Sequence, residues 1–109
     1  MEITWQDFEK VEIRAGTILS AEINEKANKP AYALKIDFGS LGVKNSSAQI
    51  TELYQAKDLV GKQIVAVVNF QPKQVASVKS ECLVLGVLDG QGIVLLQPER
   101  KVENGGRIA

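Results

Sequence analysis

The chain has no histidine and only one cysteine, Cys82, among its 109 residues. Without histidine it lacks the commonest general base and the commonest metal ligand, so catalytic triads, zinc fingers and facial-triad iron sites have nothing to build on. A single cysteine excludes an intramolecular disulfide and is typical of a reducing, cytoplasmic compartment. We therefore expect a cytoplasmic protein with no catalytic activity, no metal and no cofactor.

Long apolar runs are also absent. The longest uncharged apolar runs, IVAVVNF and CLVLGVL, fall far short of the roughly 18 residues that suggest a membrane span. The first ten residues, MEITWQDFEK, contain no basic region followed by an apolar one. We therefore expect neither a membrane span nor a secretory signal.

Neither sign of charge is in excess, because 13 basic and 13 acidic side chains give a formal net charge of zero. Residues 1–59 carry 7 basic and 9 acidic groups, and residues 60–109 carry 6 and 4, so the halves differ as −2 and +2. This weak asymmetry argues against strong non-specific binding of nucleic acid, which requires many phosphate contacts. It leaves room for a small basic patch.

What the sequence does contain is a succession of short apolar strands. The clearest is AYALKIDF, in which apolar and other residues alternate, while Gly16 lies inside the first strand and predicts a bulge or sharp bend there. Polar turns separate the segments, and Thr4 and Thr51 can each cap a helical turn. We predict strands at 11–23, 31–38, 43–50, 63–70 and 82–88, a hairpin return arm at 92–97, and helical turns at 4–10 and 51–59.

This order predicts one all-β domain covering residues 1–109. A five-stranded Greek-key barrel of the oligonucleotide/oligosaccharide-binding (OB) type, with short helical turns, has this succession of elements, and an SH3-like barrel is the main alternative. Three of the predicted strands are apolar on both faces, and a barrel hides only its inner face. The outward residues Val65, Val67, Leu83 and Leu85 therefore need a cover.

A second copy of the chain, related by two-fold symmetry, is the simplest such cover, and we predict a homodimer. The alternative is that the N-terminal turn, with Trp5 and Phe8, and the C-terminal tail cover these residues within one chain.

The connection between the strands at 63–70 and 82–88 is long and polar. Hairpin loops usually have about 2–5 residues, whereas residues 71–81 intervene here. A loop fixed at both ends by buried strands can display recognition residues. Lys73 and Lys79 could contact phosphates or acidic peptide side chains, or be solvated lysines, and Ser80 and Glu81 could line a groove. Glu81 could instead form an ion pair that holds the loop.

Residues beside this loop have two interpretations each. Asn69 could bind a base edge or a peptide backbone, or it could fasten the exit of the strand. Phe70 could stack on a base, although its strand position favours burial. Arg14 and Lys35 lie on strand faces that often form the binding surface of OB folds, but solvated charges have the same pattern. Cys82 is predicted to be a small buried apolar residue rather than a nucleophile.

Five ordered motifs give the chain a family resemblance. They are EIRAGTI (12–18), AYALKIDFG (31–39), SSAQIT (46–51), VVNFQPKQ (67–74) and SECLVLG (80–86). With them, nearly the whole chain resembles the tRNA-binding module shared by methionyl-tRNA synthetase extensions and EMAP-II-type cytokines. It is most similar to the stand-alone, export-related chaperones of that family.

The resemblance implies an OB-fold homodimer with a groove for extended ligands. Asn69, Pro72, Lys73 and Ser80 fall on the segment that carries recognition residues in the tRNA-binding relatives. The chain departs from those relatives where they have a glycine (Ser77), a nearby basic residue (Ala76) and a Gly- or Ala-Met pair (Cys82 and Leu83). These departures remove positive charge and adaptable surface.

Our hypothesis is a non-catalytic, dimeric, export-related chaperone that captures unfolded preproteins and cooperates with the secretion motor. The barrel face and the 71–81 loop would form one groove per subunit. Slots lined by Val75, Val78 and Phe70 would accept alternate side chains, while Asn69 and Gln74 would bind the ligand backbone. The alternative hypothesis is a structure-specific tRNA-binding protein.

Overall fold

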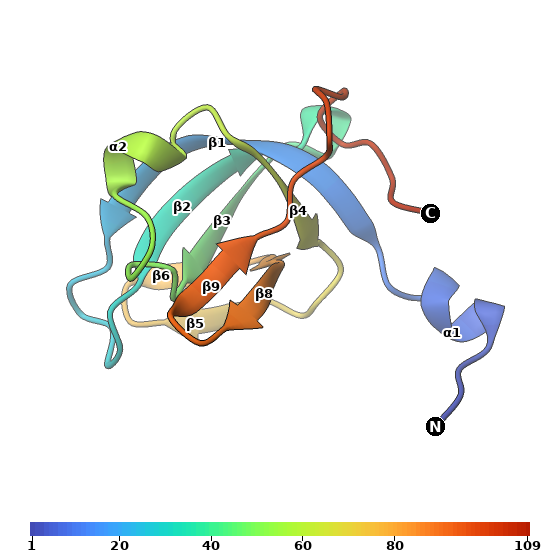
Figure 1. The fold of residues 1–109 in the computed structure, drawn as a ribbon, viewed down its shortest axis with the longest axis horizontal. Coiled ribbons are helices and arrows are strands. Elements are labelled where there is room, and N and C mark those ends of the chain that lie inside the picture. Colours follow the sequence, from blue (N-terminus) through green and yellow to red (C-terminus); the bar gives the residue numbers. More distant parts are fainter.

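A five-stranded antiparallel sheet is the main element of the computed structural model, which describes residues 1–109. The strands of this sheet lie in the order β3-β2-β1-β4-β7, and two separate hairpins, β5–β6 and β8–β9, extend from it (Figure 1). The elements are α1 (Trp5–Glu9), β1 (Ile13–Ile23), β2 (Tyr32–Asp37), the 3-10 turn η1 (Gly39–Leu41), β3 (Val43–Ala48), α2 (Ala56–Leu59), β4 (Gln63–Val67), β5 (Lys73–Val75), β6 (Val78–Ser80), β7 (Leu83–Val84), β8 (Gly86–Asp89) and β9 (Gly92–Leu95).

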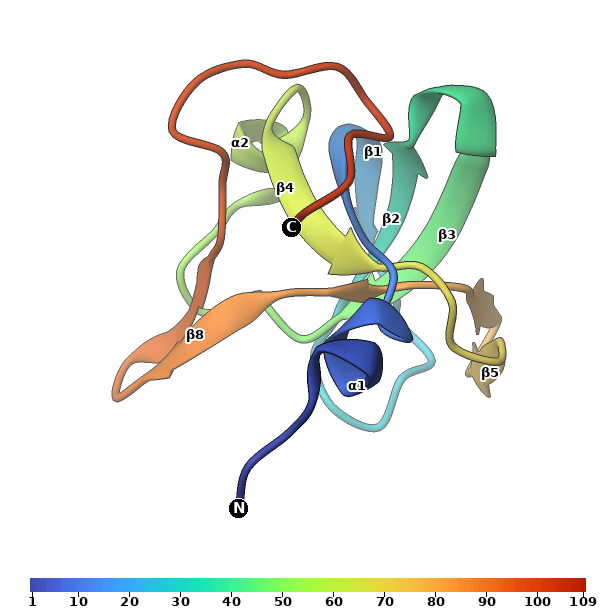
Figure 2. The same cartoon turned by 90° about the vertical axis from the view of Figure 1, so that its right-hand side faces the viewer.

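The sheet curls into a nearly closed barrel because its last strand returns to its first edge. The Glu81 amide donates to the Asn45 carbonyl on β3 at 2.8 Å, and the Ser46 hydroxyl donates to the Cys82 carbonyl at 2.9 Å. These bonds join β3 to the chain just before β7 and so close the sheet, whose curvature is visible in Figure 2. The predicted five-stranded Greek-key barrel of the OB type is confirmed.

The barrel interior is filled by the alternating residues that the sequence indicated. Leu34, Ile36 and Phe38 of the second strand region are at most 1% exposed and pack with Ile18. A Cβ atom at Gly16 would lie 2.7 Å from the Phe38 ring, so this close packing requires glycine. The bulge predicted at Gly16 lies three residues later, where the β1–β2 register shifts between Ile18 and Ser20.

Several predicted elements need correction in the second half of the chain. The middle helix begins at Ala56, and Thr51 caps nothing, because residues 51–53 form a turn. The single strand predicted at 82–88 is divided into β7 and β8 at Leu85. The connection at 71–81, predicted as a loop, contains the hairpin β5–β6. Its polar composition gave no strand signal, so tertiary anchoring rather than propensity forms this hairpin.

Part of the outer face of the barrel is buried within the single chain, and part of it remains exposed. Val65 and Val67, for which we predicted an external cover, are only 8% and 6% exposed within one chain. Leu83 remains half-exposed. The single chain therefore covers the outer face of β4, but it leaves apolar surface around β7 open.

The C-terminal tail completes one edge of β1. The Ala15 amide donates to the Gly106 carbonyl at 2.9 Å, the Gly105 amide to the Ala15 carbonyl at 2.7 Å, and the Ile108 amide to the Ile13 carbonyl at 2.9 Å. The tail thus occupies the edge of the first half of β1, while β2 pairs with the second half. At the other terminus α1 begins with the Thr4 cap that the sequence predicted and stands away from the barrel (Figure 1). Neither α1 nor α2 has the length and apolar composition that crossing a membrane requires.

Candidate ligand-binding grooves

The β5–β6 hairpin is fastened to the barrel by side chains. Asn24, buried at the end of β1, donates from Nδ2 to the Val75 carbonyl at 3.2 Å and to the Ser47 hydroxyl at 3.3 Å. On the other strand of the hairpin, the Ser80 hydroxyl accepts from the Ser47 amide at 3.3 Å. These bonds hold a polar hairpin at a defined position without making it part of the main sheet.

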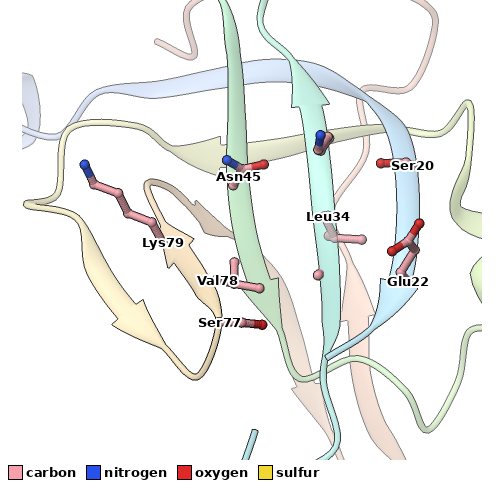
Figure 3. Close-up of a pocket in the computed structure, with 9 residues that line it drawn as sticks. Ser20, Glu22, Leu34, Asn45, Ser77, Val78 and Lys79 are labelled. Atoms are coloured by element: carbon pink, nitrogen blue, oxygen red, sulfur yellow. The ribbon is translucent and has the colours of Figure 1, made fainter. Parts of the chain in front are cut away.

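One groove lies between this hairpin and the barrel face. We call it the sheet-face groove; it has a volume of about 330 Å³, and Figure 3 shows its lining residues spread over β1, β2, β3 and β6. Its charged residues are Glu22, Lys35 and Lys79, and Val78 and Ala33 contribute apolar surface. The mixed charge suits a peptide, which carries both donors and acceptors along its backbone.

A second groove lies on the other side of the hairpin. This loop groove, of about 660 Å³, is bounded by the β1–β2 connection, β3 and β5. Lys26, Lys29 and Lys73 line it, and no carboxylate does. Val75 and Leu83 add apolar surface. The loop groove is therefore the more electropositive of the two, and it suits acidic or phosphorylated ligands better.

The structure divides the predicted site residues between these grooves. Lys35, Val78 and Lys79 line the sheet-face groove, whereas Lys73, Gln74, Val75 and Ser80 line the loop groove. The remaining predicted residues, Arg14, Asn69, Phe70 and Glu81, line neither groove. The single groove of our hypothesis is thus two grooves separated by a hairpin.

Asn69 fastens the exit of β4 to the beginning of β1. Its Oδ1 accepts from the Glu12 amide at 3.0 Å, and its Nδ2 donates to the Lys10 carbonyl at 2.7 Å. Both ends of the amide are therefore engaged within the chain. Phe70, which we expected to be buried, is 57% exposed. The reason is that β4 ends at Val67, so Phe70 follows the strand rather than belonging to it.

Arg14 and Glu81 also make internal contacts. Arg14 donates from Nη2 to the Glu12 carboxylate at 2.6 Å and from Nη1 to the Gly105 carbonyl at 3.0 Å, which ties the tail to β1. The Arg14 guanidinium lowers the pKa of the Glu12 carboxyl through a hydrogen bond and charge attraction. Glu81 accepts from the Asn45 amide at 3.0 Å, so it holds the barrel closure by a hydrogen bond rather than by the ion pair we had considered.

Cys82 lies in the core at the junction between the two hairpins. It is 5% exposed, and its thiol donates weakly to the Asn45 carbonyl at 3.8 Å. Burial raises the pKa of the thiol to about 11, which keeps it protonated at neutral pH. The predicted role of Cys82 as a small buried residue agrees with this position.

Sequence reasoning missed two residues that line the loop groove, Lys26 and Lys29, and one that anchors the hairpin beside it, Asn24. All three belong to the NEKANKP segment, which we had interpreted only as a polar turn. The turn places two lysines in the lining of the loop groove, together with Lys73. Two lysines within a polar turn were the available signal, but only the barrel topology brings this turn beside β5.

Comparisons with known proteins place the chain among relatives of two kinds. Residues 13–107 match the family described as "Putative tRNA binding domain". The chain is 36% identical over 104 residues to the methionine–tRNA ligase of Methanococcoides burtonii and 30% identical over 106 residues to that of Thermococcus onnurineus. These matches include 94% and 97% of this chain, but the chain spans only 15% and 14% of the length of the two ligases.

The relatives of the second kind are chaperones, and their solved structures match this chain over its full length. The chaperone CsaA from Bacillus anthracis is 51% identical, with a TM-score of 0.93 and complete coverage of both chains. The CsaA chaperone from Picrophilus torridus is also 51% identical, with a TM-score of 0.94, over 99% of this chain and 100% of that one. A MetRS-related protein from Pyrococcus horikoshii is 26% identical with a TM-score of 0.86.

Proposed function

This chain belongs to the tRNA-binding domain family, and within it we propose that the protein acts as a non-catalytic, export-related chaperone that binds extended segments of unfolded preproteins. The identity of 51% to two CsaA chaperones, against 26% to the MetRS-related protein that also matches over its full length, supports this function over that of a ligase domain. The observation that carries the proposal is the β5–β6 hairpin, which is anchored to the barrel and has an open groove on each side.

The geometry of β5 supports binding of an extended chain. β5 pairs only with β6, so its other edge is free of strand partners. An extended peptide can add to such an edge through main-chain hydrogen bonds, while its alternate side chains enter neighbouring pockets. Val75 and Leu83 in the loop groove would receive those side chains, and Val78 and Ala33 offer a second apolar site in the sheet-face groove.

The homodimer remains part of the proposal. Val87 and Leu88 of β8 are 54% and 85% exposed, and Trp5 of α1 is 82% exposed. Large apolar side chains gathered on a protruding hairpin and on a detached helix are typical of an interface. A second copy of the chain is the occupant we propose, since it would cover these surfaces and present four grooves on one body. Joining weak sites in this way raises avidity without new contacts.

Anisotropy of a labelled, unfolded preprotein tests the chaperone function. We expect saturable binding by the wild-type chain and about tenfold weaker binding by Val75→Asp and Val78→Asp, because each places a charge in an apolar slot. Val60→Asp is the matched control, since Val60 is exposed and lines neither groove. Equal losses in all three variants, or no binding by the wild-type chain, would contradict the proposed site.

A tRNA-binding function is the second candidate, and one observation favours it. The loop groove carries Lys26, Lys29 and Lys73 without a carboxylate. A salt series of tRNA binding tests this candidate, because the logarithm of affinity falls linearly with the logarithm of salt concentration when phosphates are neutralised. A steep slope would support tRNA as a ligand, whereas no binding at low salt would exclude it.

A further inference from the structure

A polar pocket lies at another end of the barrel, separate from both grooves. It has a volume of about 390 Å³ and lies between the α2–β4 turn and the chain that follows β9. None of its lining residues lines the sheet-face groove or the loop groove. Figure 2 shows the tail arching over α2 and the start of β4 at the top of the view, with β5 at the lower right. We call this the tail pocket.

The chemistry of the tail pocket differs from that of the grooves. None of its nine lining residues is hydrophobic. Three of them, Lys62, Arg100 and Lys101, are cationic, and only Glu99 is anionic. A site with no hydrophobic side chain offers little to an aliphatic or aromatic ligand, but an excess of two positive charges attracts an anion.

A side-chain clamp organises the backbone of the pocket. Gln63 donates from Nε2 to the Val102 carbonyl at 2.7 Å, and its Oε1 accepts from the Val102 amide at 3.0 Å. Lys62 and Lys101 are the neighbours of the clamped residues, so their backbones are held facing the same pocket. This preorganisation lowers the ordering cost when both lysines bind one ligand.

The tail and the barrel are locked together next to the clamp. The Thr17 hydroxyl donates to Asn104 Oδ1 at 2.7 Å, and Gln63 Nε2 donates to the same oxygen at 3.1 Å. Arg100, in contrast, pairs only with Glu99 at 3.0 Å, and both side chains are more than four-fifths exposed. Such an exposed pair contributes little stability, so Arg100 can turn to a stronger anion at small cost.

From these contacts we infer that the tail pocket is a phosphate-binding site, formed by Lys62, Lys101 and Arg100. Lysine ammonium groups and an arginine fork are the side chains that recognise phosphate oxygens. The phosphate can belong to the backbone of a structured RNA or to a small phosphorylated molecule, and the experiment distinguishes these sources. The inference goes beyond peptide capture, which does not involve this pocket.

Backbone amide spectra of the full-length, ¹⁵N-labelled chain test the shared chemistry, with sodium tripolyphosphate as the probe. Saturable shifts at residues 61–63 and 99–101, larger than those in the loop groove, would support the site. Absence of shifts at these residues would overturn the inference, whether or not tRNA binds.

Anisotropy of labelled tRNA over a salt series tests the source. The variant is Lys62→Ala with Lys101→Ala, and the control is Lys10→Ala with Lys44→Ala, which removes the same charge from residues that line none of the described pockets. For a backbone contact we expect the slope of log affinity against log salt to fall by about 2 in the variant, and affinity at low salt to fall at least about tenfold. The control should change both values much less.

If the variant and the control change tRNA affinity equally, while tripolyphosphate still shifts the amides of the tail pocket, the pocket is assigned to a small phosphorylated ligand. Preprotein binding should be unaltered in both double variants, so failure of this inference and failure of the chaperone proposal are separable.

Discussion

The two hairpins outside the main sheet follow one another in the chain but have opposite surfaces. β5–β6 carries Lys73, Gln74, Lys79 and Ser80 and is bonded to the barrel by buried or half-buried polar side chains. β8–β9 carries exposed apolar residues, of which Leu88 is the most exposed.

An isolated two-stranded hairpin is marginally stable in water, so each of them needs support from elsewhere. The first hairpin receives its support from Asn24 and from Ser47 within the same chain. The second is joined to the barrel mainly at its base, where the Leu95 amide donates to the Tyr54 hydroxyl at 3.0 Å and the Leu85 amide donates to the Val65 carbonyl of β4 at 2.8 Å. This difference in support and surface is the basis for the two proposed roles, ligand binding for β5–β6 and subunit contact for β8–β9.

The largest effect should come from placing a charge on the apolar hairpin. In a two-fold interface Leu88→Asp removes two buried leucines and buries two carboxylates, so we expect the dimer dissociation constant to rise at least about 100-fold. Size-exclusion chromatography with light scattering at micromolar concentration measures the mass. Leu41→Asp, at an exposed residue of η1, is the control. A wild-type chain that is monomeric, or a Leu88→Asp dimer of unchanged stability, would contradict the proposed interface.

The junction between the hairpins can be probed through Cys82. Burial raises the pKa of its thiol from the ordinary 9.0 to about 11 in the folded chain, so the native thiolate fraction near pH 8 is about 100-fold lower than in the unfolded chain. Alkylation by iodoacetamide should be slower by at least that factor in the native protein.

The same shift affects stability. Between pH 9 and pH 11 the unfolded chain loses the thiol proton while the folded chain retains it, so the free energy of unfolding should decrease as the pH rises. Cys82→Ser, compared in urea titrations at pH 8 and pH 10.5, should lack this part of the pH dependence. Rapid native alkylation at pH 8 would show that the junction opens.

The two lysines of the first hairpin should contribute unequally to tRNA binding. Lys73 shares its groove with two further lysines and no carboxylate, whereas Lys79 shares its groove with one lysine, Lys35, and with Glu22. We expect Lys73→Ala to weaken tRNA binding about tenfold at low salt and Lys79→Ala about threefold, with preprotein binding mostly retained. The measurement is anisotropy with both ligands. If each variant weakened the binding of tRNA and of preprotein equally, separate lysine contributions to tRNA binding and to peptide capture would be contradicted.

Removing the anchor should loosen one hairpin and spare the other. Asn24→Ala deletes the bonds to the Val75 carbonyl and the Ser47 hydroxyl, which together contribute about 1–2 kcal/mol. Hydrogen exchange should accelerate in β5 and β6 but not in β8 and β9. Asn28→Ala, an exposed residue of the same connection, should leave exchange unaltered. Acceleration in both hairpins would mean that they form one cooperative unit.

The smallest effects concern the two turns. Ala76 has φ of 55°, a left-handed conformation that costs an alanine about 1 kcal/mol, so Ala76→Gly should raise the melting temperature by a few degrees. Gly90, in the turn of the other hairpin, has no positive φ and open space around its Cβ position, so the reverse change Gly90→Ala should also stabilise, by about 0.5 kcal/mol. Destabilisation by Ala76→Gly would show that the strain is compensated elsewhere.

The first half of the chain could be predicted from its sequence because its strands are long and alternate regularly. Leu34, Ile36 and Phe38 are buried as the period-two pattern required, and β1 and β2 have nearly the predicted bounds. The second half has short strands whose ends depend on partners far away in the chain. Phe70 was misplaced for this reason, since an apolar run alone does not mark where a strand stops.

The residue types of the candidate site could be predicted from the sequence, but their distribution between two grooves could not. Lys73 and Lys79 are six positions apart in a polar segment, and nothing local indicates that a hairpin separates them into different grooves. Asn24 and Lys26 are on a distant turn that only the barrel topology brings near β5. The pairing of Gly105 and Ile108 with β1 likewise has no local signal, because these residues gain strand partners only from the closed barrel.

The pairing of the C-terminal tail with β1 can form only at the end of protein synthesis. Arg14 on the first strand is bonded to Gly105, across 91 positions of sequence. Until residue 108 has left the ribosome, one edge of β1 is a row of unpaired amides and carbonyls, open to other nascent chains. A protein proposed to bind unfolded chains is therefore, during its own synthesis, in the condition of its clients, and its long-range closure should make folding slow relative to helical domains of equal size.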